Sequence, residues 1–114
     1  MAEPLRFKTQ DGREFILEFN RRTVQLAERS GFDVQKVDEK MMNGIPELFF
    51  YAFKMHHAWI KKDETDRILF EEFKGLTTDE MKRLVELYSA PYDTLLHNIE
   101  EGDEKNSRLV TILN

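Results

Sequence analysis

The sequence predicts a mainly α-helical fold: an N-terminal β-hairpin, four or five packed helices and a flexible C-terminal tail. Apolar residues alternate on both sides of an Asp-Gly pair near the N-terminus, which is typical of a hairpin. Four aromatic residues gather within five positions at the middle of the chain, and an apolar stripe with helical spacing follows Thr77. At 114 residues the chain can build one modest core but not two.

The composition narrows the class of partner. Hydrophobic residues make up 40% and charged residues 34%, an ordinary balance for a soluble protein. The net charge of −5 argues against a nucleic-acid or anionic-membrane partner. With no cysteine there is no disulfide or thiolate chemistry, which suits a reducing cytosol. Met1-Ala2-Glu3-Pro4 shows no basic region followed by an apolar run, so we expect no secretory signal, and the central apolar run is too short to span a bilayer. We therefore expect an intracellular protein.

The hairpin is expected from Leu5 to Phe19, and the turn decides its register. A two-residue Asp-Gly turn would pair Phe7 with Ile16 and place Phe15, Leu17 and Phe19 on the opposite face. A three-residue turn with a left-handed Gly12 pairs Phe7 with Phe15 and leaves the charged residues facing solvent, so we prefer it. Ile16 then points outward, either as an isolated exposed residue or as a contact. Because a lone hairpin is marginal in water, it must pack on the helices.

Two helices are expected before the centre of the chain. Asn20 is a good N-cap for a helix through Arg29 or Ser30, and Gly31 suits the left-handed residue after its end. A second, weaker helix is capped by Asp33. Its apolar positions are Val34, Val37 and Met41.

The central helix is expected to begin after Asn43-Gly44, which should break the chain, and to run to Ile60. Pro46 fits its first turn. Its broad apolar face should pack in the core, with Phe53 and Trp59 buried. That face comprises Ile45, Leu48, Phe49, Ala52, Phe53, Met55, His56, Trp59 and Ile60.

The remaining aromatic residues of this helix predict a partner-binding surface. Phe50 and Tyr51 lie off the packed face, beside Lys54 and His57. A helix that is apolar on nearly all sides is the centre of a fold or half of an interface, and clustered exposed apolar groups usually mark interaction sites. With Ile16 on the hairpin, these four residues form the predicted partner-binding site. His56 is expected to be packed and His57 exposed.

Two further helices are expected in the C-terminal half. Asp63 can cap a short helix over residues 65–73, which stops at Gly75. Thr77 begins a capping box for a long amphipathic helix, and Pro91 should kink it. The apolar stripe of the long helix comprises Met81, Leu84, Val85, Tyr88, Tyr92, Leu95, Leu96 and Ile99. We assign residues 1–100 to a single domain and residues 101–114 to a flexible acidic tail.

No residue pattern predicts an enzyme. His56 and His57 are neighbours and point about 100° apart on a helix, so they do not readily chelate one metal. No serine sits in a Gly-x-Ser-x-Gly frame, and the scattered glycines form no phosphate loop. The acid pairs Glu71-Glu72 and Glu100-Glu101 are typical of solvated faces. We expect no catalytic residue, cofactor or metal site.

A set of short segments carries a family resemblance. They are Phe19-Asn20-Arg21-Arg22-Thr23-Val24, Glu28, Gly31-Phe32, Ile45-Pro46-Glu47-Leu48-Phe49, Ala52-Phe53, His56-His57 and Leu84-Val85-Glu86-Leu87-Tyr88. With these segments the chain resembles the tail assembly chaperones of long-tailed (siphovirus-type) bacteriophages, especially those that infect Gram-positive hosts.

The resemblance implies a non-enzymatic function. In that family the protein coats the long tape-measure protein in the host cytoplasm before the tail tube polymerises, and it is absent from the finished virion. The implied partners are the tape-measure protein and, as a second candidate, the major tail protein. Many members also have a longer, frameshifted form. The alternative function is a small phage or bacterial adaptor or inhibitor that binds one host protein.

Overall fold

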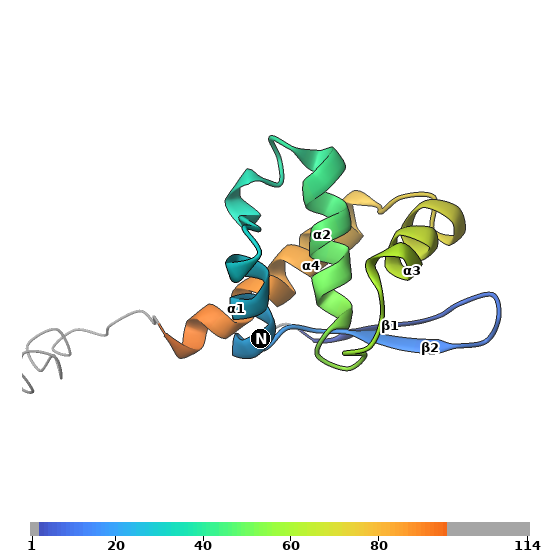
Figure 1. Cartoon of the computed structure of the whole chain (residues 1–114), viewed down its shortest axis with the longest axis horizontal. Helices are drawn as coiled ribbons and strands as arrows, with labels where there is room; N and C mark the ends of the chain where they lie inside the picture. Colours follow the sequence, from blue (N-terminus) through green and yellow to red (C-terminus); the bar gives the residue numbers. More distant parts are fainter. Residues whose placement is uncertain (1–2, 96–114) are drawn as a thin grey trace, which may run out of the picture.

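The computed structural model describes residues 3–95 of the chain, and these residues form a mainly α fold behind an N-terminal β-hairpin, as predicted (Figure 1). The elements are β1 (Leu5–Lys8), β2 (Glu14–Leu17), α1 (Arg21–Arg29), the 3₁₀ turn η1 (Val34–Lys36), α2 (Met41–Phe53), α3 (Lys62–Arg67), the π-helical turn η2 (Ile68–Glu72), α4 (Thr78–Ser89) and the 3₁₀ turn η3 (Ala90–Thr94).

Helix α2 is the central element of this arrangement. It contacts α1, η1, α3, α4 and β2. In Figure 1 the hairpin crosses the C-terminal end of α2, with α1 on one side, α3 on the other and α4 behind. The predicted organisation around one apolar helix is therefore confirmed, although the bounds of that helix differ from the prediction.

The hairpin has the predicted register. Phe7 pairs with Phe15, and the strands are antiparallel. The backbone N–H of Thr9 donates to the carbonyl oxygen of Arg13 at 2.8 Å, which closes a three-residue loop. Gly12 adopts φ +89° in this loop, the left-handed conformation that glycine tolerates best. The alternation of apolar and charged residues thus selected the turn correctly.

Helix α1 begins and ends as its cap residues predict. The Asn20 side chain accepts a hydrogen bond from the backbone N–H of Thr23 at 2.9 Å. At the C-terminal end the N–H of Phe32 donates to the carbonyl of Ala27, and the N–H of Gly31 donates to the carbonyl of Glu28. These two bonds form a Schellman motif, which requires a left-handed residue at position 31.

Replacing Gly31 with alanine is expected to destabilise the protein by about 1–2 kcal/mol, because Gly31 has φ +94° and a β-carbon is strained there. An added β-carbon would have no atom within 4 Å, so the loss comes from the backbone alone. Thermal unfolding measures the effect. Gly31→Asn serves as the control and should lose less, since asparagine tolerates the left-handed region. Equal stability of Gly31→Ala and the parent would contradict this account.

The start of α2 corrects the prediction of a chain break at Asn43-Gly44. The helix begins at Met41, so both residues lie inside it and Pro46 lies in its second turn. The reason is packing: a β-carbon on Gly44 would lie 3.1 Å from the α-carbon of Val37. Gly44 therefore permits a close approach between α2 and the preceding segment instead of forming a turn.

The expected second helix is also wrong in extent. Only the single turn η1 forms, with the Asp33 carboxylate accepting from the backbone N–H of Gln35 at 3.0 Å. Asp33 is a cap as predicted, but Met41 belongs to α2 and is exposed. Val37 is buried and packs on Gly44. This contact holds the segment before α2 in position, although the longer helix does not form.

The C-terminal elements follow the prediction more closely. Helix α3 begins at Lys62, earlier than expected, so Asp63 lies in its first turn and is not its cap. The Thr77 capping box is present, with Thr77 and Glu80 exchanging backbone-to-side-chain hydrogen bonds. At Pro91 the α-helical bonding gives way to η3. Leu96, Ile99 and the predicted tail lie outside the described residues.

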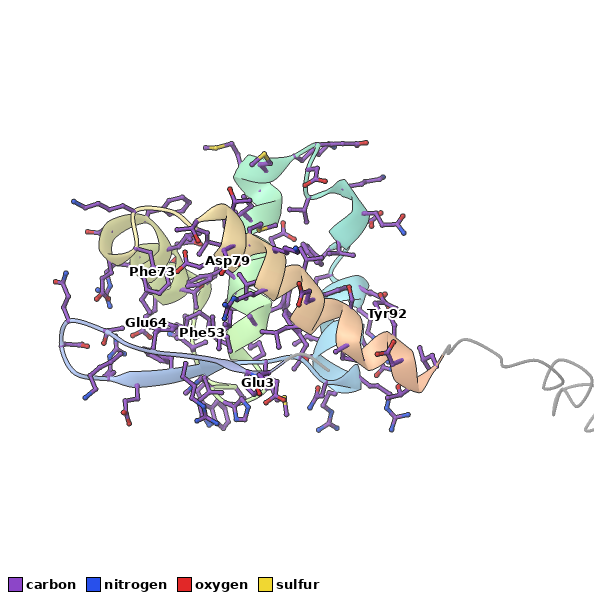
Figure 2. All side chains as sticks on the ribbon, turned by 180° about the vertical axis from the view of Figure 1, so that it is seen from behind. Glu3, Phe53, Glu64, Phe73, Asp79 and Tyr92 are labelled. Carbon is purple, nitrogen blue, oxygen red and sulfur yellow. The ribbon has the colours of Figure 1, made fainter. Side chains whose placement is uncertain are left out.

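The core forms where α2 meets the hairpin. Phe53 is fully buried, and its ring lies 5.0 Å from that of Phe49 and 5.2 Å from that of Phe15. Phe7 and Phe73 extend this aromatic cluster toward β1 and the end of η2. Figure 2 shows Phe53 and Phe73 between the hairpin and the helices. Burial of the apolar face of α2 up to Phe53 is confirmed.

Candidate functional site

The most prominent exposed apolar residue lies in the connection between α2 and α3. Trp59 is 94% exposed, and Met55 in the same connection is also exposed. This corrects the prediction that Trp59 packs in the core. Because α2 ends at Phe53, Trp59 no longer shares the buried face of that helix. We call the exposed side chains of Met55 and Trp59, with the pocket beside them, the Trp59 surface.

The Lys54 side chain fixes the backbone of this connection through hydrogen bonds. Its ammonium nitrogen (Nζ) donates to the carbonyl oxygen of Ala58 at 3.0 Å and to that of Ile60 at 3.3 Å. The same nitrogen lies 4.8 Å from the centroid of the Phe50 ring, a cation–π geometry. Ile60 is buried and anchors the far end of the loop. The predicted partner-binding residue Lys54 thus has a local role that fixes the backbone around Trp59.

His57 joins the connection to the hairpin. The backbone N–H of Ile16 donates to the ring nitrogen Nε2 of His57 at 2.9 Å. The His57 ring also packs on Phe15, with centroids 4.9 Å apart. Because Nε2 is an acceptor, His57 is neutral with its proton on Nδ1. Burial lowers the pKa of His57, and the neighbouring His56 adds to this effect.

The expected roles of the two histidines are therefore reversed. His57 is half-buried, whereas His56 is exposed and lies 2.8 Å from the carboxylate of Glu18. The expectation assumed one continuous helix through both residues. Since the helix ends at Phe53, the chain turns and brings His57 under β2.

Acidification from about pH 7.5 to 5.5 is expected to loosen this connection. Burial depresses the folded-state pKa of His57 below 6.5, so its contribution to stability is complete above the unfolded pKa and is lost as the pH falls through the folded pKa. Protonated His57 also cannot accept from Ile16. Across this pH range the melting temperature should fall less for His57→Gln than for the parent, since glutamine keeps an acceptor. His56→Gln is the control and should retain most of the fall, since burial, and not His56, is the larger cause of the lowered pKa of His57. If His57→Gln behaves like the parent, the bond to Ile16 does not carry this dependence.

A shallow pocket of about 490 Å³ lies beside Trp59. Its lining combines apolar and polar side chains, and Glu64 at its border pairs with Arg13 at the hairpin turn. The lining residues are Phe15, Met55, His56, His57, Ala58, Trp59, Ile60 and Glu64. An open pocket beside an exposed indole can take an apolar side chain of a partner protein.

The structure brings together only part of the predicted partner-binding site. Ile16 and His57 meet beside the Trp59 surface, and Phe50 and Lys54 contact each other. Ile16 is half-exposed, and its backbone N–H donates to His57, while a contact of its side chain with a partner stays a prediction. Tyr51 is only 9% exposed and faces Phe32, which corrects its placement off the packed face. A buried side chain is not available to a partner.

Sequence reasoning missed Met55 and Trp59 as surface residues. Residues 54–59 contain no glycine or proline, so no local signal marks the end of α2. The helix ends because Lys54 bonds forward to two carbonyl groups and His57 bonds to the hairpin, and these contacts depend on the tertiary structure.

Within residues 3–95, no group of three or more metal-binding side chains comes together, and none of the helices is long and apolar enough to cross a membrane. The family model described as "Domain of unknown function (DUF5055)" matches residues 1–113. The chain belongs to this family. Comparisons with curated proteins and with solved structures found no significant match.

Proposed function

We propose that the protein is a tail assembly chaperone of a long-tailed bacteriophage, which binds apolar helical stretches of the tape-measure protein and keeps them soluble. The observation that carries this proposal is the exposed Trp59, held on a tethered connection above a shallow pocket. The sequence resemblance described above supplies the class of partner. The protein would act in the host cytoplasm and be absent from the finished virion.

The chemistry of the Trp59 surface suits such a client. Tryptophan is enriched at the residues that dominate interface energetics, and methionine offers adaptable apolar contact. The bonds from Lys54 and His57 fix the loop before binding, which reduces the entropy lost on association. An amphipathic helix presents apolar side chains at regular spacing, and these can contact Trp59 and enter the adjacent pocket. Ile16, Phe50, Lys54 and His57 remain predicted contacts at the edges of this surface.

Co-expression with the tape-measure protein tests the proposal. With the chaperone present, the tape-measure protein should stay in the soluble fraction and co-purify with it. The control is the same tape-measure protein expressed alone, which should aggregate through its apolar stripes. If the client is insoluble in both cases, or soluble in both without co-purification, the chaperone function fails.

A small adaptor or inhibitor that binds one host protein is the second candidate. The Trp59 surface favours it equally well, because one exposed anchor and one pocket are enough for a single partner. The two functions differ in stoichiometry. A chaperone that coats a long client binds it in many copies, whereas an adaptor forms a complex of fixed, small ratio. Light scattering of the purified complex distinguishes them.

A further inference from the structure

The two edges of the hairpin differ in what covers them. On β2 the outward backbone N–H of Ile16 donates to the ring of His57 at 2.9 Å. The next outward N–H, that of Glu18, donates to the carbonyl oxygen of Ala52 at 3.0 Å. The edge of β2 is therefore covered by the C-terminal end of α2 and by the connection that follows it.

The edge of β1 is open over its middle. Arg6 pairs with Ile16, and the residues of such a pair direct their N–H and carbonyl groups away from each other. The backbone groups of Arg6, and those of Lys8 two residues later, therefore point outward. In the described part of the chain these groups have no hydrogen-bond partner. Farther along, the N–H of Gln10 donates to the Glu72 carboxylate at 2.8 Å, which ends the open stretch.

An apolar pocket lies beside this edge, on the core side of β1. It has a volume of about 100 Å³ and is bordered by β1, the segment after η2 and the N-terminal half of α4. Its walls include the side chains of Leu5, Phe7, Phe73, Leu76 and Leu84. The pocket has room for one aliphatic side chain. Unpaired backbone groups and an apolar pocket thus occur together at β1.

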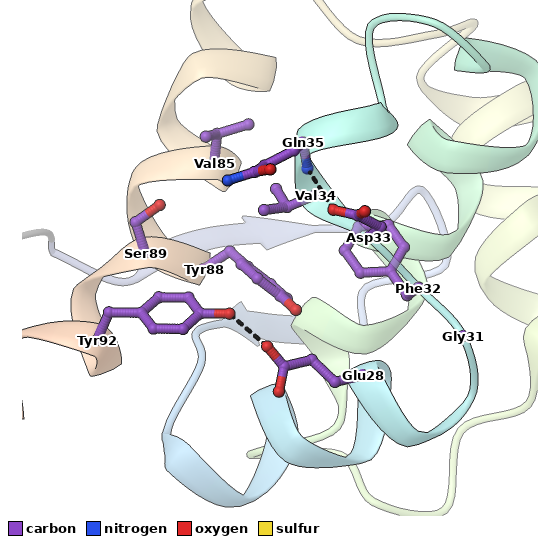
Figure 3. Close-up of a pocket in the computed structure, with 10 residues that line it drawn as sticks. All are labelled: Glu28, Gly31, Phe32, Asp33, Val34, Gln35, Val85, Tyr88, Ser89 and Tyr92. Atoms are coloured by element: carbon purple, nitrogen blue, oxygen red, sulfur yellow. Dashed lines mark hydrogen bonds between the residues drawn. The ribbon is translucent and has the colours of Figure 1, made fainter. Parts of the chain in front are cut away.

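The concave surface beside the C-terminal half of α4 is different. Figure 3 shows the Tyr92 hydroxyl donating to the Glu28 carboxylate there, and Asp33 accepting from the backbone N–H of Gln35. These polar groups bond to one another within the domain. The outward backbone groups of β1 are not satisfied in this way, so β1 is the side of the fold that can accept further main-chain hydrogen bonds.

We propose that the edge of β1 binds an extended segment of a partner protein, which adds a third strand to the hairpin. In this mode of recognition, main-chain hydrogen bonds supply affinity and pockets for alternate side chains supply specificity. The added strand is antiparallel to β1, since antiparallel pairing is the more stable per residue. The site lies on the opposite edge of the hairpin from the Trp59 connection, so the proposal does not depend on the tape-measure protein being the client.

The pairing also determines the chemistry of the segment. Residues directly opposite each other in a sheet share a face, so those opposite Arg6 and Lys8 lie beside two exposed cations. Lys8 lies opposite Glu14 across the hairpin, but neither cation forms an ion pair within residues 3–95. Acidic residues fit these two positions. The residue between them lies opposite Phe7, beside the pocket, and is aliphatic. The segment therefore alternates acidic, aliphatic and acidic residues.

The same charges disfavour a second copy of this chain as the occupant. Two β1 strands paired antiparallel about Phe7 would place Arg6 of each copy opposite Lys8 of the other. Like charges directly opposite each other destabilise a sheet, and charged residues on edge strands commonly prevent pairing between identical edges. A segment with acidic residues is instead attracted to this edge.

Titration of the full chain with the peptide acetyl-Thr-Glu-Ile-Glu-Thr-amide, followed by NMR, tests the edge. The backbone amide resonances of Arg6 and Lys8 should shift, with a dissociation constant on the order of 1 mM for so short a strand. With the peptide at about ten times that concentration, exchange of these two amides with solvent should slow about tenfold. A peptide that does not bind would overturn the proposal, and the charges of β1 would then only protect the edge from pairing.

Two methylated forms of this peptide separate main-chain from side-chain contacts. The N–H groups of the two glutamates face β1 in the proposed pairing, whereas that of the isoleucine faces away. Methylation of both glutamate nitrogens should abolish binding, and methylation of the isoleucine nitrogen should leave it unchanged. Equal affinity of the two methylated peptides would refute strand addition.

The double variant Arg6→Gln/Lys8→Gln should bind the peptide about fivefold more weakly, as expected for the loss of two cross-strand charge pairs. Arg29→Gln/Lys36→Gln is the matched control, because it removes the same charge from exposed positions outside β1. This control should bind like the parent. An equal loss in both variants would mean non-specific attraction, and undiminished binding by the β1 variant would contradict the acidic character of the partner.

Amide exchange in the free protein identifies any other occupant. If protection of Arg6 and Lys8 rises with protein concentration, a second copy pairs with the edge. If both amides are protected at every concentration and lose this protection in the full chain with Val110→Pro and Ile112→Pro, the chain covers its own edge, since proline cannot donate to a strand ladder. Either result would refute the assignment to a partner protein.

Discussion

Replacing Phe53 with alanine is expected to lower the free energy of unfolding by about 3–5 kcal/mol. Phe53 is fully buried, and its ring packs against those of Phe7, Phe15 and Phe49. The substitution leaves a cavity where α2 meets the hairpin, and these rigid elements cannot collapse to fill it. A small domain has about 5–15 kcal/mol of stability, so much of it would be lost. Chemical denaturation measures the change.

Trp59→Ala is the matched control, since it also removes a large aromatic side chain. Trp59 is 94% exposed, so this variant should unfold within about 0.5 kcal/mol of the parent. The sequence alone predicted that both residues are buried, and hence a large loss for each. A large loss for Trp59→Ala would mean that its side chain packs on the domain in solution, and a small loss for Phe53→Ala would contradict the core.

If the protein has the proposed chaperone function, Trp59→Ser is expected to weaken binding of the tape-measure protein by about 2 kcal/mol, or roughly 30-fold, while leaving the melting temperature unchanged. The indole is the largest exposed apolar group beside the pocket, so its loss removes the main anchor of the Trp59 surface. Affinity measured with a soluble helical segment of the tape-measure protein provides the test.

Met42→Ser is the control for this experiment. Met42 is 84% exposed and lies in the first turn of α2, about 17 Å along the helix from Phe53, where the Trp59 connection begins. It should bind the client like the parent. Equal losses in the two variants would indicate a general apolar attraction. An unchanged affinity for Trp59→Ser would move the binding surface elsewhere, first to Phe50 and Ile16.

The parts of the fold that were predictable depend on short-range chemistry. The alternation of residues fixed the hairpin register, and Asn20 and Thr77 marked two helix starts through side-chain bonds to residues three positions ahead. Gly31 marked a helix end, because glycine readily adopts the left-handed conformation found at that position. Each signal lies within a few residues of the feature it specifies, so it can be recognised without knowledge of the tertiary contacts.

The failures occur where tertiary contacts override local preference. Gly44 resembles a turn residue, yet its missing side chain lets α2 approach Val37, a contact that no local rule describes. The segment after Phe53 resembles a helix, yet His57 turns toward the backbone of Ile16 in β2. Because of this second failure the sequence did not predict the Trp59 surface, since Trp59 is exposed only if the helix ends early.

The long-range hydrogen bonds of the hairpin have a consequence for synthesis of the chain. The N–H of Gln10 bonds to Glu72, 62 residues later, and that of Ile16 bonds to His57, 41 residues later. A two-stranded hairpin alone is marginal, so β1 and β2 become stable only when these partners, which follow them in the chain, have been made. At ordinary translation rates, the delay until residue 72 is about 3–12 s. During that interval the rings of Phe7 and Phe15 are not fully packed against Phe53 and Phe73. The nascent chain is then most exposed to aggregation and to binding by cellular holdases.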